Sequence, residues 1–281
     1  MDPHMDSSRI DFCFHHGMSH NLVRANMSKR RKLESTVAAI QRQYGPQALQ
    51  RGAARSVYPM PVSLSTGFPP LDELTGCGGI PRTGITLLGG RATSGKLTIA
   101  YKCLVAGQVR GNVALVDLAG SSDPDYLARC GVDLEKLFWV RPRPNTDLVS
   151  LVGDLVQTGQ LSLLVIDSVA DLFRQGRQTR QWRHHLSPLL AALRQQQCGL
   201  LVIEEPTPPW LRWLGLDAAA QIRPQALLHI ELRRERWLTD DGELKGYQVQ
   251  AHLHRSRWAP SGRTAQLGIH FNGTVKAAST W

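Results

Sequence analysis

Three features are missing from this sequence, and each absence excludes a class of protein. The cysteines stand far apart and never form a Cys-x-x-Cys pair, which argues against a zinc site and against a disulfide framework. No apolar run approaches the roughly 20 residues that a membrane span needs. No secretory signal pattern opens the chain. We therefore expect a cytoplasmic protein with no membrane partner.

Acidic residues are also scarce. The chain has 23 Asp and Glu against 33 Lys and Arg, which gives a formal net charge of +10 and a pI of about 9.8. Such a surface attracts polyanions, and nucleic acid is favoured over membrane because no lipid-facing segment exists. A basic soluble protein without a polyanionic partner is the alternative. With 42% hydrophobic residues among 281, the chain can bury one sizeable α/β core.

The most informative stretch that is present has the sequence GRATSGKLT and follows a short apolar run. An amphipathic segment comes after it, which completes the strand, loop and helix context of a phosphate-binding loop. Its two glycines let backbone N–H groups turn inward around an anion, and its lysine reaches the outer phosphates. The residues predicted to bind nucleotide are Gly90, Arg91, Ala92, Thr93, Ser94, Gly95, Lys96, Leu97 and Thr98.

One position of this loop departs from the motif. The residue after the lysine is normally Ser or Thr because its hydroxyl binds Mg²⁺, and Leu97 occupies that place. The hydroxyl comes one residue later, at Thr98. A metal-facing carboxylate is expected at Asp167, where a long apolar run ends. Thr98 and Asp167 are thus the predicted Mg²⁺ ligands.

Strand and helix patterns alternate along the rest of the chain, which predicts an α/β fold with a mainly parallel central sheet. The predicted strands are 85–88, 113–118, 137–140, 161–168 and 200–203, with helices at 123–130, 148–156 and 186–197. Three β segments, 226–238, 247–254 and 265–271, predict an antiparallel extension. We expect a disordered leader (1–27), an N-terminal helix and linker (28–60), an ATP-binding core (61–275) and a tail (276–281).

The order of motifs from about Lys29 to about Val275 resembles the bacterial RecA recombinase family. The shared stretches are Ser65-Thr66-Gly67, Leu71-Asp72, Gly78-Gly79-Ile80-Pro81, the phosphate loop, Asp123-Pro124-Asp125-Tyr126, Gly131-Val132-Asp133 and Ile166-Asp167-Ser168-Val169-Ala170. The resemblance implies a RecA-like P-loop NTPase core with ATP and Mg²⁺ as cofactors. It also implies single-stranded DNA as a ligand and assembly into a homo-oligomer or filament.

The resemblance assigns three residues to the bound nucleotide. Tyr126 would stack on adenine, and an ordinary half-buried helix tyrosine is the alternative. Arg255 and Arg257 align with two lysines that reach ATP across the filament interface in that family. Arginine keeps the charge and adds a planar fork for phosphate. A solvated strand edge with alternating basic side chains is the alternative for this pair.

Two segments align with the loops that hold single-stranded DNA in the family. The first, 173–183, places an arginine at every third position beside aromatic residues, which suits phosphate attraction and base stacking. One solvated helix face is the alternative. The second, 206–224, is apolar enough to anchor a partner protein through its tryptophans instead. The predicted DNA-binding residues are Arg174, Arg177, Arg180, Trp182, Arg183, Trp210, Arg212 and Trp213.

Three positions depart from the family on the catalytic side. Leu97 replaces the Ser or Thr whose hydroxyl binds the metal ion, and Ala119 stands where the family has the glutamate that activates water. Glu205 replaces a glutamine that senses the γ-phosphate. Loss of a general base removes about two to four orders of magnitude of rate. Glu204 and Glu205 are the weak catalytic candidates that remain, so hydrolysis is expected to be slow or absent.

Three functions fit these observations. The first is a RecA-like DNA repair and recombination accessory protein that binds ATP and single-stranded DNA, or a recombinase or polymerase partner. The second is an active DNA-dependent ATPase recombinase in which Thr98 and a carboxylate such as Asp117 or Glu204 substitute for the lost groups. The third is a nucleotide-independent adaptor that docks through Trp210 and Trp213. Because the family's C-terminal domain has no counterpart in this sequence, the chain also resembles the ImuA group, which accompanies an error-prone polymerase in damage-induced (SOS) mutagenesis.

Overall fold

The computed structural model describes residues 31–45, 58–143, 146–168, 178–207, 210, 213, 217–240, 242–271 and 275–277. The chain divides into two compact units between Val57 and Tyr58. The described part of the first unit is a helix over residues 31–44, as expected from its apolar stripe. The helix stops at Gly45, whose φ of 92° lies in the left-handed region that ends many helices. Within the described ranges, no helix combines the length and the apolar character that crossing a membrane requires.

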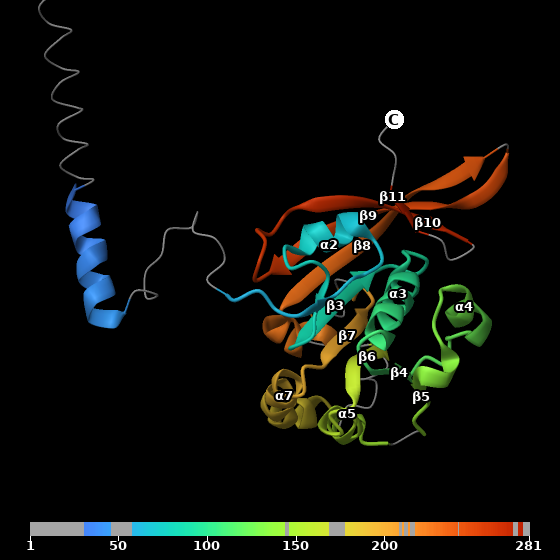
Figure 1. Ribbon diagram of the computed structural model, residues 1–281, viewed down its shortest axis with the longest axis horizontal. Helices are drawn as coiled ribbons and strands as arrows, with labels where there is room; N and C mark the ends of the chain where they lie inside the picture. Colours follow the sequence, from blue (N-terminus) through green and yellow to red (C-terminus); the bar gives the residue numbers. More distant parts are fainter. Residues whose placement is uncertain are drawn as a thin grey trace, which may run out of the picture. The chain divides into compact units, whose positions relative to one another are not determined.

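The second unit is built on a nine-stranded sheet in the order β11-β10-β9-β8-β3-β7-β6-β4-β5 (Figure 1). Its strands are β3 (Ile85–Gly90), β4 (Asn112–Asp117), β5 (Leu137–Val140), β6 (Leu161–Asp167), β7 (Gly199–Glu204), β8 (Leu228–Asp240), β9 (Glu243–Ser256), β10 (Thr264–His270) and β11 (Val275–Ala277). Strands β3 to β8 pair in parallel, whereas β8, β9, β10 and β11 pair antiparallel. The predicted parallel sheet with an antiparallel C-terminal extension is confirmed.

Helices cover both faces of the parallel strands, which explains why every residue of β3, β6 and β7 is buried. Alternate residues of β6 divide between two cores: Leu163 and Val165 belong to one, and Leu164 and Ile166 to the other. The helices of this unit are α2 (Pro69–Thr75), α3 (Lys96–Gln108), α4 (Pro124–Arg129), α5 (Leu148–Gln157) and α7 (Gln178–Gln195), with 3₁₀ turns η1 (Leu134–Lys136), η2 (Ala218–Gln221) and η3 (Arg223–Gln225).

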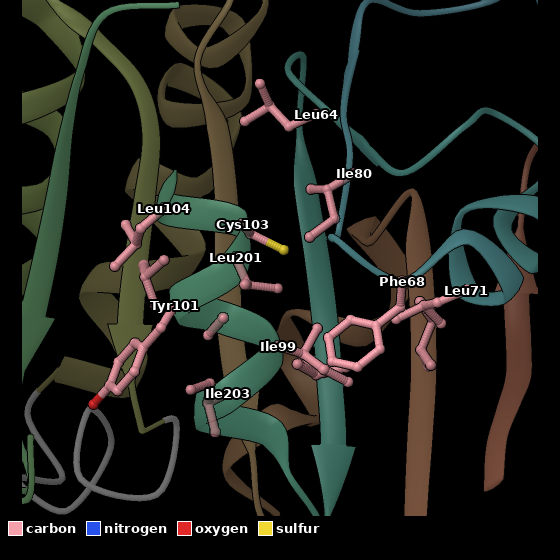
Figure 2. Packing of buried hydrophobic residues seen from close by; sticks show 14 of the residues in the cluster. Leu64, Phe68, Leu71, Ile80, Ile99, Tyr101, Cys103, Leu104, Leu201 and Ile203 are labelled. Atoms are coloured by element: carbon pink, nitrogen blue, oxygen red, sulfur yellow. The ribbon is translucent and has the colours of Figure 1, made fainter. Parts of the chain in front are cut away.

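Helix α3 follows the phosphate loop and packs into the first of these cores. Figure 2 shows Ile99 and Cys103 facing Phe68 and Ile80, while Tyr101 points to the other side of the helix. Helices α5 and α7 pack against each other over the opposite face of the sheet. The sheet thus fixes the loop between β3 and α3 at its carboxyl edge. The register that pairs Asp117 with Asp167 brings two acidic side chains to that same edge.

Three short elements were not predicted: α2, strand β11, and a two-stranded sheet of β1 (Ser63–Leu64) and β2 (Ile80–Pro81). The segment before the phosphate loop is dense in glycine and proline, which favours turns over a helix. Helix α2 is nevertheless anchored by Asp72. Its carboxylate accepts hydrogen bonds from Ser65 Oγ at 2.6 Å and from the Thr66 backbone at 2.8 Å. The Ser-Thr-Gly and Leu-Asp stretches of the resemblance are therefore joined by hydrogen bonds in the fold.

Helix α7 begins earlier than predicted. The pattern predicts its start at Leu186 and a loop up to Arg183, but the helix starts at Gln178 and continues through Pro188. A proline inside a helix removes one backbone hydrogen bond, so the sequence around Pro188 favours a helix start over a helix interior. The first half of the predicted loop, residues 173–177, lies outside the described residues.

Candidate nucleotide site

A cleft of about 680 Å³ opens at the carboxyl edge of the parallel strands. The phosphate loop forms its floor, because all residues of the loop from Ala92 to Thr98 line it. Its walls come from the segments after β4, β6 and β7 and from the antiparallel extension. Gly90 and Arg91 stand at the loop's entrance, where their carbonyl oxygens accept hydrogen bonds from Lys96 Nζ. The nine predicted loop residues thus form one continuous structure.

The two glycines of the loop are required by its geometry. Gly90 has a φ of 152° and Gly95 a φ of 87°. A Cβ at Gly90 would lie 2.5 Å from Ser94 Oγ, and one at Gly95 would lie 2.2 Å from the Ile269 side chain. Ser94 Oγ is itself buried and has no hydrogen-bond partner among the described residues. A tight loop with an unpaired buried hydroxyl fits a bound phosphate.

Lys96 is held inside this loop. Its Nζ donates to the Gly90 carbonyl and, at 3.3 Å, to the Arg91 carbonyl. Glu205 Oε1 lies 3.6 Å from the same nitrogen. Burial lowers the pKa of Lys96, and the nearby Glu205 carboxylate opposes that shift. The lysine therefore has an anionic partner within the cleft.

The two acids at the ends of β4 and β6 have different surroundings. Asp167 lines the cleft, where Ser121 Oγ donates to its Oδ2 at 3.1 Å. Asp117 is fully buried and accepts from Arg141 Nε at 3.0 Å, while the Arg141 guanidinium stacks on Trp139. Asp167 is thus placed toward a ligand, and Asp117 is paired with an arginine.

The hydroxyl of Thr98 already has a contact inside the protein. It lies 2.6 Å from the phenol oxygen of Tyr126, whose pKa burial raises to about 12. Leu97 offers no oxygen in the preceding position. The described residues contain no group of three or more His, Cys, Asp or Glu side chains that could hold a metal ion. A Mg²⁺ ion here would rely on phosphate oxygens for most of its ligands, with Asp167 as the protein carboxylate.

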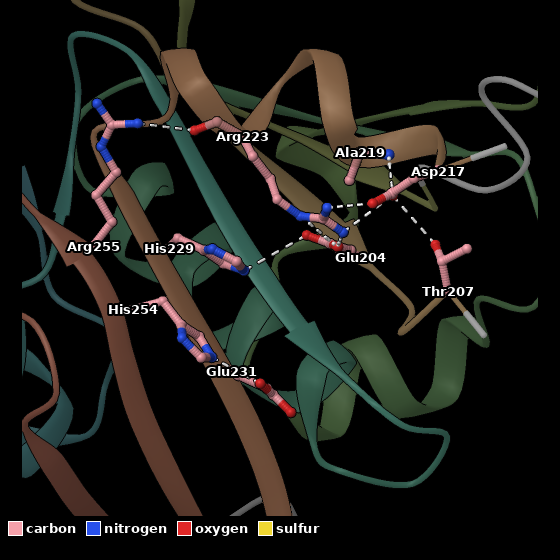
Figure 3. Close-up of polar contacts among 9 residues, drawn as sticks. All are labelled: Glu204, Thr207, Asp217, Ala219, Arg223, His229, Glu231, His254 and Arg255. Atoms are coloured by element: carbon pink, nitrogen blue, oxygen red, sulfur yellow. Dashed lines mark hydrogen bonds and ion pairs between the residues drawn. The ribbon is translucent and has the colours of Figure 1, made fainter. Parts of the chain in front are cut away.

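The two candidate catalytic carboxylates diverge at the end of β7. Glu205 lines the cleft, whereas the buried Glu204 accepts hydrogen bonds from Arg223 on the other side (Figure 3). Arg223 also pairs with Asp217, so one arginine joins two acids. Ala119, which is predicted to stand at the general-base position of the family, also lines the cleft.

His229 lies beside this charge cluster. Its Nε2 is 3.6 Å from the second carboxylate oxygen of Glu204. Burial, together with the neighbouring His254 and Arg223, lowers the pKa of His229 to about 4. The imidazole is therefore neutral at physiological pH.

Three aromatic residues of the cleft were not predicted. Trp237 on β8, Tyr247 on β9 and Phe271 after β10 line it together, with ring centroids 5.9 to 6.3 Å apart. Arg234 stacks over Trp237 at 4.2 Å and donates to Thr93 Oγ1 at 3.0 Å. These residues meet only through the register of the antiparallel strands, which the sequence pattern does not specify.

The arginines assigned across an interface have partners within their own chain. Arg255 Nη1 donates to the carbonyls of Arg223 and Pro224, and Arg257 stacks over Tyr58 at 4.9 Å. Neither lines the cleft. Their contact with a neighbouring subunit's nucleotide stays a prediction.

The predicted DNA-binding residues are only partly described. Arg180, Trp182 and Arg183 lie within α7, and Arg174, Arg177 and Arg212 lie outside the described residues. Trp210 and Trp213 are 62% and 86% exposed. Large exposed tryptophans fit either of their two predicted roles, base stacking or protein docking.

Comparison with known proteins supports the resemblance. Residues 31–193 match the family described as RecA N-terminal domain. The chain belongs to the RecA family. It is 27% identical to Protein RecA of Streptomyces coelicolor over 92% of this chain and 77% of that protein, and 28% identical to Protein RecA of Aquifex aeolicus over 87% and 76%.

A solved structure agrees with this assignment. The crystal structure of the RadB recombinase has a TM-score of 0.58 and 25% identity, and the match covers 75% of this chain and 97% of that one. This RecA-family chain therefore has the RecA-like fold that the order of motifs predicts.

Proposed function

We propose that this RecA-family chain is a DNA repair and recombination accessory protein that binds ATP and hydrolyses it slowly or not at all. One observation carries the proposal: the phosphate loop with Lys96 and the methyl group of Ala119, which the resemblance aligns with the family's general base, line the same cleft. ATP and Mg²⁺ are inferred from the family. Mg²⁺, when bound, would neutralise phosphate charge and polarise the terminal phosphate.

The binding half of the proposal rests on the loop. Its inward N–H groups and the N-terminal end of α3 favour an anion, since the helix dipole places positive charge there. Lys96 adds a formal charge, and Ser94 Oγ adds an unpaired hydroxyl. Tyr126 lines the same cleft at a position that suits a stacked base.

Slow or absent hydrolysis is supported by three carboxylates near the cleft, each of which already faces a cation. Asp117 pairs with Arg141, and Glu204 pairs with Arg223. Glu205 faces Lys96 at 3.6 Å. A general base must be free to accept a proton from water, and each of these three carboxylates faces a cation instead.

A phosphate-release assay with single-stranded DNA tests this proposal. We expect no release above the background given by the Lys96→Ala variant, because no carboxylate of the three is placed to activate water. DNA-stimulated release that Lys96→Ala abolishes would instead establish the second candidate, an active ATPase recombinase.

DNA binding is the second part of the proposal and rests on the basic charge and the arginine-rich segment before and within α7. Arg177→Ala should lower the slope of log affinity for single-stranded DNA against log salt by about 0.7, the loss of one phosphate contact. Fluorescence anisotropy at several salt concentrations measures this slope. Arg110→Ala, an exposed arginine after α3, is the matched control and should leave the slope unchanged. Equal slopes for the two variants would exclude Arg177 as a phosphate contact.

The exposed tryptophans support a further part of the proposal, a protein partner. Trp210 and Trp213 are three residues apart and both lie on the surface. Exposed aromatic anchors of this kind dominate the binding energy of many interfaces. We infer a RecA-type recombinase or an error-prone polymerase as the partner, and a homo-oligomer or filament as the alternative assembly.

A further inference from the structure

The first residue after β7 brings a negative charge to the phosphate loop. Glu205 Oε1 lies 3.6 Å from Lys96 Nζ, and both side chains line the same cleft. The Glu205 side chain is 57% exposed, whereas that of Lys96 is 8% exposed. The acid thus reaches the lysine from the open side, where a ligand must enter.

A phosphate-loop lysine normally serves the β- and γ-phosphates, while the loop's N–H groups cradle the phosphates closer to the nucleoside. The terminal group of a triphosphate must therefore share Lys96 with Glu205. Two anions beside one cation repel each other, and the repulsion is strong where water is partly excluded. A diphosphate has one phosphate group fewer, so it brings less negative charge to the position beside Lys96 and Glu205.

We propose that Glu205 makes this cleft prefer a nucleoside diphosphate over the corresponding triphosphate. The inference rests on the proposed function, because it requires that nucleotide binds at the Lys96 loop. It goes further because it assigns Glu205, the first residue after β7, a role in selecting the nucleotide.

Among the described residues, groups near the cleft that could offset a third phosphate are absent or already engaged: Arg234, a cation beside the loop, stacks over Trp237 and donates to Thr93 Oγ1 at 3.0 Å. Leu97 has no oxygen for a metal ion, and the Thr98 hydroxyl lies 2.6 Å from the Tyr126 phenol oxygen. Arg223, a cation beside the end of β7, pairs with Glu204 and Asp217 (Figure 3). It is therefore not available to neutralise Glu205.

Calorimetric titration of the full chain with ADP and with ATP tests this inference, each in Mg²⁺ and in EDTA. We expect the wild-type chain to bind ADP about tenfold more tightly than ATP in both conditions. Glu205→Gln should reduce the preference to about twofold, mainly by tightening ATP, because it removes the charge and keeps the shape. Glu135→Gln, an exposed acid in η1 outside the cleft, is the control and should keep the wild-type ratio.

The outcomes separate the two proposals. If the wild-type chain binds ATP as tightly as ADP, or if Glu205→Gln leaves the ratio unchanged, the inference is wrong and nucleotide binding stands. If neither nucleotide binds, both are wrong. A second variant, Glu205→Ala, removes the same charge by another route and should also reduce the preference for ADP. Thermal melting of each variant establishes that it is folded.

Discussion

Replacing Lys96 with alanine is expected to weaken nucleotide binding by about 100-fold, which corresponds to about 2.7 kcal/mol. A hydrogen bond between an ammonium group and a phosphate contributes about 1.5–3 kcal/mol, and burial in the cleft strengthens it. Lys96 is 7% exposed and already oriented by two backbone carbonyls of the loop, so little side-chain entropy is lost on binding. Titration with a fluorescent adenine nucleotide measures the change.

Lys136→Ala is the matched control for this loss. The Lys136 side chain lies in η1, is 61% exposed and pairs with Asp133 at the surface, so its removal should leave affinity unchanged. If Lys96→Ala also lies within about threefold of the wild type, nucleotide does not bind at the loop. The same variant tests the adaptor hypothesis: partner binding that survives Lys96→Ala but is lost in Trp213→Ala would assign the function to the exposed tryptophans.

The second large effect concerns stability. Arg223→Met should lower the free energy of unfolding by about 3 kcal/mol at pH 7, because it leaves two buried carboxylates without their cation. The Glu204 side chain is 7% exposed and that of Asp217 is 10% exposed. Arg223 helps to hold the pKa of Asp217 below its usual value, against the effect of burial. Urea unfolding followed by circular dichroism measures the loss.

The pH dependence of this variant follows from the same charges. Without Arg223, Asp217 loses the cation that lowers its pKa while burial still raises it, so protonation of Asp217 favours the folded state of the variant. The loss should therefore shrink as the pH falls from 7 toward 5. Arg233→Met is the control, since the Arg233 side chain is 70% exposed and pairs with Glu231 at the surface. A loss below about 1 kcal/mol for Arg223→Met would mean that water solvates the two acids.

Continuous patterns in the sequence were sufficient to predict much of the fold. The strand from Leu161 to Asp167 was predicted to within one residue, because a short, mostly apolar run that ends in an acid is typical of a buried parallel strand. Helix α2 was missed since seven residues beginning with two prolines resemble a turn. The start of α7 was missed because Pro188 hides the continuity of the helix.

The candidate site was likewise predictable only in part. The phosphate loop is contiguous in sequence and could be predicted, whereas Trp237, Tyr247 and Phe271 come together through strand register. Glu204 and Glu205 show why single residues escape prediction. Successive side chains of a strand point to opposite sides, so two identical neighbours have unrelated surroundings. The alternation of the strand does not tell which of them faces the cleft, whereas the resemblance, which aligns Glu205 with a γ-phosphate-sensing glutamine, favours Glu205.

The different partners of Glu204 and Glu205 also bear on the segment that follows them. Arg223 donates hydrogen bonds to both Glu204 and Asp217. Glu205 directly follows Glu204 in the sequence. Asp217 follows the tryptophan-bearing segment and Glu204 precedes it, so this one arginine joins the two ends of that segment beside β7. The closed stretch of chain contains both tryptophans and also Glu205, the partner of Lys96.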